Sequence, residues 1–212
     1  ANPVRGWAQA AHLPALVGLP DVELAAVCTT REKSAAESAR KFGARLAFHD
    51  HQDMLAKADL DAVLVSVKVP EHYRLTMDAL DAGLPVYTEW PLGASLEEAQ
   101  QMADKAREKG VSTMVGLQAR CDPTSLRLKE LVDDGYVGEV LSASLVQFGS
   151  GILARDSDRT WQRDKTLGAN TLTIAFGHVI DALCMSLGEF NEVSSVVATR
   201  VDQWHETDTG KD

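Results

Sequence analysis

Short apolar segments alternate with helix-period segments from residue 22 to residue 117, and this alternation restricts the chain to few folds. Ala62–Val67 is almost continuously apolar, which is typical of a strand buried on both faces. Leu96–Lys109 has helical periodicity, with Ser95 and Glu98 placed for a capping box and Gly110 as terminator. Because parallel strands need right-handed helical crossovers, the alternation predicts a doubly wound parallel α/β sheet of Rossmann type.

The same rhythm assigns the other elements of this region. We expect strands at residues 22–28, 45–48, 62–67, 86–88 and 112–117, and helices at residues 32–42, 53–58, 71–82 and 96–109. The chain opens at Ala1 directly before an amphipathic helix, whereas a parallel-sheet protein normally opens with a strand. We therefore expect the first strand of the sheet either to lie before residue 1 or to be absent.

The rhythm changes after Pro123. A helix over residues 125–133 is followed by an alternating strand over 140–148, a helix over 168–187 and another alternating strand over 193–201. Long strands with one apolar face predict a mostly antiparallel sheet in an α+β domain. We place the boundary near residues 118–123, which predicts a dinucleotide-binding domain at 1–120 and a partial substrate or oligomerisation domain at 121–212.

Composition excludes several classes of function. The net charge of −10 and the pI near 5.0 argue against direct nucleic-acid binding, which usually needs a basic surface. No leader-like start is present, and no apolar run is judged long enough to cross a membrane. Three widely spaced cysteines, Cys28, Cys121 and Cys184, are typical of reduced thiols rather than of a disulfide or metal site. We expect a cytoplasmic protein.

Polar or conformationally special residues follow the predicted strands, where open α/β sheets bind their ligands. The four strand ends are Thr29-Thr30-Arg31, Ser66-Val67-Lys68-Val69-Pro70, Glu89-Trp90-Pro91 and Gln118-Ala119-Arg120. Contact with solvent alone explains one polar strand end, but four together favour a ligand site. The first end has no acidic residue for a ribose 2′-hydroxyl, and its arginine suits a 2′-phosphate. Alternatively, this arginine only begins the next helix and points to solvent.

Three motifs carry a resemblance to a known family. They are Glu89-Trp90-Pro91-Leu92-Gly93, His72 at six residues beyond Ser66, and Gly177-His178 followed by Asp181. In this order and spacing the chain resembles the glucose–fructose oxidoreductase/inositol dehydrogenase (Gfo/Idh/MocA) family over essentially its whole length. It looks most like the branch that contains the fungal galactose-regulon repressor, a cofactor-binding relative that is not an enzyme.

The resemblance implies a nicotinamide cofactor, NAD or NADP, with NADP slightly favoured by Arg31. It assigns a cofactor site to Gly6, Trp7, Thr29, Thr30, Arg31, Ser66, Val67, Lys68, His72, Glu89, Pro91 and Gln118. It assigns a catalytic site to His178, Asp181 and Trp90, with no metal. Gly6 is the one visible counterpart of the family's Gly-x-Gly-x-x-Gly turn. His178 is otherwise a structural histidine, and Asp181 either buttresses it or is structural.

Two departures from the family bear on activity. Trp90 replaces the lysine that hydrogen-bonds the reacting hydroxyl, and Ile174 replaces the aspartate four residues before the histidine. Three functions stay open: an oxidoreductase acting on a sugar, cyclitol or related polyol; a non-catalytic dinucleotide-sensing regulator that binds a protein partner; and a module that binds no cofactor. The family also implies a homo-oligomer formed through the sheet of the second domain.

Five other residues are weaker candidates. Arg120 either contacts a ligand or forms a salt bridge at the domain boundary. We expect His49 and His51 in a loop, and we expect Trp161 and Trp204 to serve in packing rather than in ligand stacking.

Overall fold

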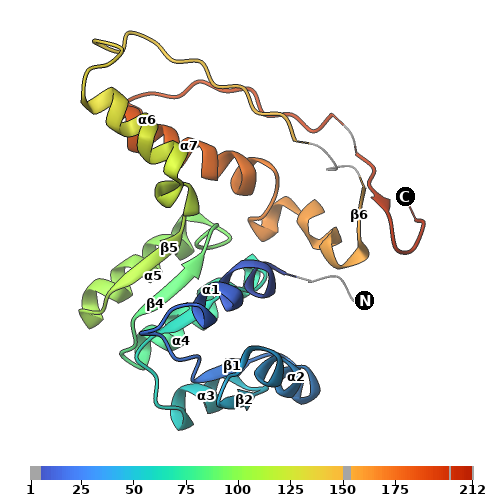
Figure 1. The fold of residues 1–212 in the computed structure, drawn as a ribbon. Helices are drawn as coiled ribbons and strands as arrows, with labels where there is room; N and C mark the ends of the chain where they lie inside the picture. The colour runs from blue at the N-terminus through green and yellow to red at the C-terminus, as the bar shows by residue number, and fades with distance from the viewer. Residues whose placement is uncertain (1–5, 150–153, 201, 212) are drawn as a thin grey trace. The chain divides into compact units, whose positions relative to one another are not determined.

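The computed structural model describes residues 6–149, 154–200 and 202–211, and it divides the chain into two compact units (Figure 1). Unit 1 is Ala1–Gly116 and unit 2 is Leu117–Asp212. The predicted α/β class with parallel strands is confirmed in unit 1, where every strand pair is parallel.

Five short parallel strands build the sheets of unit 1. β1 (Ala26–Cys28) pairs with β2 (Leu46–Phe48), and β4 (Val86–Glu89) lies between β3 (Val63–Val65) and β5 (Thr113–Gly116). A doubly wound sheet has the strand order 3-2-1-4-5-6, with the first strand at its centre. The pair β2-β1 corresponds to positions 3-2 of this order, and β3-β4-β5 corresponds to positions 4-5-6. Among the described residues no strand occupies position 1, at the centre. The two groups of strands are separated at this position.

Helices precede and connect these strands. They are η1 (Ala8–His12), α1 (Leu13–Val17), α2 (Glu32–Phe42), α3 (His51–Lys57), η2 (Val69–Glu71), α4 (His72–Asp81) and α5 (Leu96–Lys109). The bounds of α5 are those expected: the Ser95 hydroxyl accepts from the Glu98 amide, and the Glu98 carboxylate accepts from the Ala94 amide. Gly110 ends the helix with a φ of 65°, which favours glycine.

The core of unit 1 forms where α4 and α5 cover the three-stranded sheet. Val65, Ala79, Leu80, Val86 and Ala106 pack together there and are almost fully buried. Because strand, helix and strand follow one another closely in sequence, each crossover covers the strands that it connects.

Unit 2 is mostly helical. Its elements are η3 (Gln118–Cys121), α6 (Pro123–Asp133), η4 (Ser157–Arg163), η5 (Lys165–Leu167), η6 (Leu172–Phe176) and α7 (Gly177–Leu187), with β6 (Ala154–Arg155) parallel to β7 (His205–Glu206). The Asp122 carboxylate begins α6 by accepting from the amides of Thr124 and Ser125. The helix predicted from Gly168 is instead a π-helical turn followed by α7.

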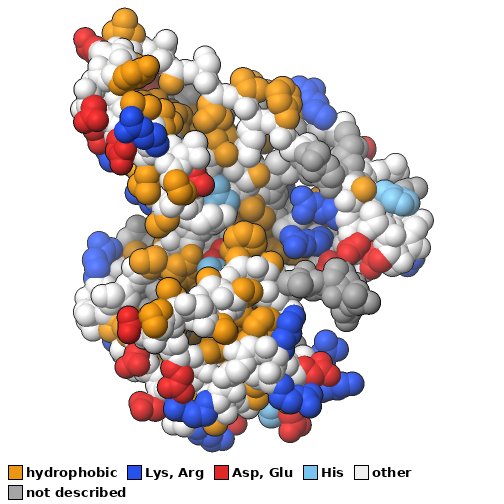
Figure 2. Space-filling model, in the orientation of Figure 1, with side chains coloured by type: hydrophobic (Ala, Val, Ile, Leu, Met, Phe, Trp, Pro, Cys, Tyr) orange, Lys and Arg blue, Asp and Glu red, His pale blue; other side chains and the backbone are white. Residues whose placement is uncertain are grey.

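The two long strands predicted for unit 2 are not formed. Residues 140–148 and 193–200 form no strand in the structure, and Val201 lies outside the described residues. Leu141 and Phe148 are 88% and 93% exposed, so the apolar face that should hold such strands has nothing to cover it. Figure 2 shows apolar side chains at the surface over α6 and the segment that follows it. Strand formation needs a paired backbone and a covered face, and here neither is present.

One stretch among the described residues corrects the expectation of no membrane-length apolar run. Lys165–Leu187 spans 23 residues with a mean hydropathy of 1.3, enough by length and composition to cross a membrane. Core helices of globular domains pass the same test, so the length and composition of one helix do not establish a span. This stretch is built from η5, η6 and α7, and it carries both His178 and Asp181.

Candidate functional site

The carboxyl ends of β3, β4 and β5 form one edge of unit 1, which we call the strand-end rim and define by Ser66–Lys68, Glu89–Pro91 and Gly116. Glu89 is the last residue of β4, and it lies in register with Gly116, the last residue of β5. The rim therefore brings together two of the four strand ends predicted to bind a ligand, the one that begins at Ser66 and the one that begins at Glu89. Ligands of open parallel sheets bind at such an edge.

His72 connects two segments of the rim. It is 1% exposed at the start of α4, where its Nδ1 lies 2.8 Å from the Pro91 carbonyl oxygen and its Nε2 lies 3.2 Å from the Val67 carbonyl oxygen. Carbonyl oxygens only accept, so a neutral ring donates to one of them at a time. The Trp90–Pro91 peptide bond is cis. His72 thus acts on the backbone of the rim and is too buried to reach a ligand directly.

Glu89 is held from two sides. Its carboxylate contacts Nε2 of His12, the last residue of η1, and both side chains are mostly buried. A Cβ added to Gly116 would lie 2.8 Å from Glu89 Oε1, so the carboxylate rests on the backbone of β5. Neither partner is predicted from the sequence, because a single histidine and a single glycine at these distances along the chain carry no spacing signal.

The end of β1 has its own hydroxyl cluster. The Thr29 hydroxyl lies 2.6 Å from the Ser34 hydroxyl, and both are placed to donate to the Arg31 carbonyl oxygen. Thr30 and Arg31 are exposed. Ser34, in the first turn of α2, is a further polar residue at this strand end that the sequence analysis did not single out.

The first helical segment of unit 1 begins with an open glycine. Gly6 has a φ of 91°, where other residues are strained, and a Cβ added to it would meet nothing within 4 Å. Trp7 beside it is 49% exposed, and Lys68 is also exposed. An open glycine backbone at the start of a helical segment suits the close approach of a pyrophosphate.

The predicted acid/base residues lie on one helical stretch of unit 2. His178 is the second residue of α7 and is partly buried, while Ile174 lies in the preceding π-helical turn. The Asp181 carboxylate accepts three hydrogen bonds from Arg120, at 2.6 to 3.0 Å, in a bidentate pair. These hydrogen bonds raise the pKa of the Arg120 guanidinium. Of the two roles considered for Arg120, the structure contains the salt bridge, and it lies within unit 2. Gln118 is exposed in η3.

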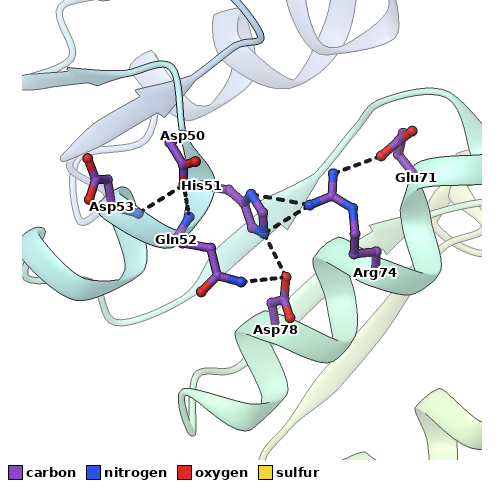
Figure 3. A network of polar contacts seen from close by, with 7 residues as sticks. All are labelled: Asp50, His51, Gln52, Asp53, Glu71, Arg74 and Asp78. Carbon is purple, nitrogen blue, oxygen red and sulfur yellow. Dashed lines mark hydrogen bonds and ion pairs between the residues drawn. The ribbon is translucent and has the colours of Figure 1, made fainter.

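The prediction that His51 lies in a loop is wrong, because it is the first residue of α3 (Figure 3). Its Nε2 lies 2.6 Å from Asp78 Oδ2 on α4, and Arg74 lies against the ring. Asp50 caps the same helix, which explains why the helix begins earlier than expected. His49 lies in a bend. Among the described residues no three histidine, cysteine, aspartate or glutamate side chains are grouped to hold a metal ion.

Two arginines lie near the ring of Trp204 in unit 2. The guanidinium carbons of Arg155 and Arg163 are 5.6 and 5.9 Å from the centroid of its ring. Arg155 also donates to Gln162, and Arg163 pairs with Glu206. These contacts place Trp204 in a packed cluster, as the sequence analysis expected for it.

Two family models match the chain. Residues 4–117 match the model described as an oxidoreductase family with an NAD-binding Rossmann fold. Residues 123–212 match the model of the C-terminal domain of Gal80p.

Individual relatives include enzymes and a regulator. The chain is 41% identical over 143 residues to the dehydrogenase aclE of Aspergillus oryzae, covering 68% of this chain and 39% of that protein. It is 28% identical to the galactose/lactose metabolism regulatory protein GAL80 of Saccharomyces cerevisiae, covering 95% of this chain and 49% of that protein. A super-repressor mutant of Gal80p from the same yeast is similar in structure, with a TM-score of 0.79 and 27% identity, over 88% of this chain and 50% of that chain. The chain thus spans about half or less of these relatives.

Proposed function

The chain belongs to the Gfo/Idh/MocA oxidoreductase family, and we propose that it binds a nicotinamide dinucleotide at the strand-end rim and acts, within the whole protein, on a sugar, cyclitol or related polyol. The observation that carries this proposal is the rim itself. The buried His72 ring lies between the Pro91 and Val67 carbonyls and donates to one of them at a time, and Glu89 presents a carboxylate held by His12 and Gly116. In this proposal residues 1–120 bind the cofactor, and residues 121–212 begin a domain for substrate binding and oligomer formation.

Different residues of unit 1 would bind different groups of the cofactor. Gly6 would let the pyrophosphate approach the backbone of the first helix, and Arg31 would pair with a 2′-phosphate, which favours NADP over NAD. The exposed Lys68 and the Glu89 carboxylate suit the other ribose and amide groups, as a donor and an acceptor. When bound, the nicotinamide supplies the hydride donor or acceptor.

Catalysis would depend on His178 as the acid/base for the substrate hydroxyl. Trp90 offers one weakly acidic N–H in place of the family lysine, and Ile174 offers no polar group. A positioned acid/base is typically worth about 10²- to 10⁴-fold in rate. We therefore expect slow turnover relative to lysine-bearing relatives.

A regulator that senses the dinucleotide and binds a protein partner is the second candidate. Two observations favour it: the match of residues 123–212 to the C-terminal domain of Gal80p, and the replacement of the lysine and the aspartate by Trp90 and Ile174. In this reading the rim still binds the cofactor, and no substrate is turned over. The homo-oligomer and the cytoplasmic location are proposed for either candidate.

One set of variants of the whole protein separates these functions. Calorimetry measures the binding of NAD and NADP to the wild type and to Arg31→Ala. A polyol and sugar panel, followed by nicotinamide absorbance, compares the wild type with Trp90→Lys, Trp90→Lys/Ile174→Asp and His178→Ala. Slow turnover that His178→Ala abolishes supports the enzyme, and binding without turnover in every variant supports the regulator. Fast turnover that survives His178→Ala contradicts the mechanism, and absence of dinucleotide binding contradicts both candidates.

A further inference from the structure

The contact between His12 and Glu89 joins residues 77 positions apart in the sequence. His12 ends η1, the first helical turn after Gly6, and Glu89 ends β4 at the strand-end rim. Their side chains are 18% and 12% exposed, so the pair is shielded but not sealed from solvent. A contact of this kind links the helix that follows the glycine turn to the rim.

The chemistry of the two side chains determines which of them donates the hydrogen bond. An ionised carboxylate only accepts, so Nε2 of His12 must carry the proton that it donates to Glu89. The ring also packs edge-to-face on Tyr87 of β4, with centroids 5.3 Å apart and planes at 72°. The aromatic contact orients the ring, and the oriented ring places its N–H on the carboxylate.

Gly116 closes the opposite side of the carboxylate. An added Cβ there would lie 2.8 Å from Oε1 and 2.9 Å from Cδ of Glu89. The Glu89 residue as a whole is 9% exposed. The β5 backbone confines the carboxylate on one side and His12 on the other, and its remaining lone pairs can accept a hydrogen bond at the rim.

We infer that His12 is a positioning residue, which holds the Glu89 carboxylate as the acceptor for a hydroxyl group of the bound dinucleotide. This inference rests on the proposed cofactor site and adds a residue to it from the first helical segment. A mostly buried polar pair adds little to stability that apolar packing would not supply equally well. Its placement at the ligand edge of the sheet gives it a role in binding.

Two substitutions in the whole protein separate the N–H of His12 from its ring. His12→Phe keeps an aromatic ring against Tyr87 and removes the donor, whereas His12→Gln keeps a donor near the position of Nε2 and removes the ring. A hydrogen bond to a charged group is worth enough that losing it should weaken dinucleotide binding roughly 10- to 100-fold in His12→Phe. We expect His12→Gln to bind within about threefold of the wild type, since its amide replaces the donor. Calorimetry with NAD and NADP measures the affinities, and thermal melting without ligand confirms that each variant is folded.

The outcomes are distinct. Wild-type affinity in His12→Phe, or an equal loss in both variants, overturns the inference and leaves the proposed cofactor site standing. A wild-type protein that binds neither NAD nor NADP overturns the proposed function, and the inference with it.

Discussion

Unit 1 and unit 2 are similar in length but differ in how well they bury their apolar side chains. Of the buried apolar residues in the described parts of the chain, all but Ala169 lie in unit 1. Unit 2 instead exposes large apolar side chains along residues 136–148 and 187–197. The contrast lies in packing rather than in composition, because both units have apolar periodic segments.

The difference follows from how each kind of sheet is completed. In unit 1, a strand, the following helix and the next strand lie close in sequence, so each crossover covers its own strands. In unit 2, the alternating segments at 140–148 and 193–200 need partner strands and a covering layer, and short-range contacts supply neither. A βαβ unit therefore closes with local chain, whereas an antiparallel sheet depends on partners from farther away.

The largest expected effect comes from the same substitution made in the two units. Leu80 is 0% exposed in the core of unit 1, and Leu141 is 88% exposed in unit 2. We expect Leu80→Ala to lower the free energy of unfolding by about 2–5 kcal/mol, through lost burial and the cavity left behind. Leu141→Ala should change it by no more than about 0.5 kcal/mol. Urea unfolding followed by circular dichroism measures both.

The leucine variants can also contradict the difference in packing between the two units. A cost above about 2 kcal/mol for Leu141→Ala would be of the size expected for a core residue, and it would mean that this side chain is covered in solution. Unit 2 would then be packed as well as unit 1, and the contrast drawn above would not hold.

The next largest effect concerns the glycine beneath Glu89. A Cβ in Gly116→Ala would press on a carboxylate that His12 already holds, so we expect a loss of about 1–3 kcal/mol in stability. Gly135→Ala in unit 2 is the control, because its φ is 71° but nothing lies within 4 Å of an added Cβ. Its cost of about 1–2 kcal/mol arises from the backbone alone.

Cofactor affinity separates these two glycine variants. Gly116→Ala should weaken dinucleotide binding, because the Glu89 carboxylate must move, whereas Gly135→Ala should leave the affinity unchanged. Equal affinities in both would indicate that Glu89 takes no part in binding.

The sequence predicts local features well and contacts between distant residues poorly. Leu96–Lys109 has the predicted bounds because its cap and its terminator lie within the segment. The alternation at 140–148 shows the same kind of local signal, yet no strand forms, because pairing is decided elsewhere in the chain. The candidate site divides in the same way: the motif around Glu89 is readable, but its contact with His12 joins elements that only the fold brings together.

A third prediction uses the cysteines as reporters of the two units. Cys121 is exposed in η3, whereas burial, aided by the charge of Asp50, raises the pKa of the Cys28 thiol in β1. Burial, aided by the charge of Glu189, also raises the pKa of Cys184 on α7. A raised pKa leaves less thiolate at neutral pH, so we expect Cys121 to be alkylated roughly tenfold faster than either. Mass spectrometry of timed iodoacetamide reactions gives the three rates.

The relative alkylation rates of Cys28 and Cys184 test how well α7 is packed in unit 2. If α7 opens readily, Cys184 should react well ahead of Cys28, and reaction at the rate of Cys121 would mean that α7 does not shield it at all. Equal slow rates would show that α7 is as well protected as the sheet of unit 1.

The smallest expected effect compares one helix cap from each unit. Amide hydrogen bonds from Asp53 and Gln52 hold the pKa of Asp50 below its ordinary value, and the hydroxyl and amide of Thr166 do the same for Asp164. A depressed carboxyl pKa in the folded state means that the cap stabilises above the unfolded pKa, near about 4, and that this contribution is lost as the pH falls further. Asp50→Asn keeps a good capping side chain but cannot titrate, so it should leave α3 unchanged at neutral pH.

In acid the cap variants should differ from the wild type. We expect the protection of the Gln52 and Asp53 amides against hydrogen exchange, relative to their intrinsic rates at the same pH, to fall below about pH 4 in the wild type. It should be retained in Asp50→Asn, since the amide cap does not change charge. Asp164→Asn is the matched variant in unit 2, where the amide of Thr166 is the reporter. That site caps only the three residues of η5, so acid should expose it with little effect on its surroundings. If Asp50→Asn accelerated exchange already at neutral pH, the carboxylate charge rather than the hydrogen bonds would be holding the start of α3.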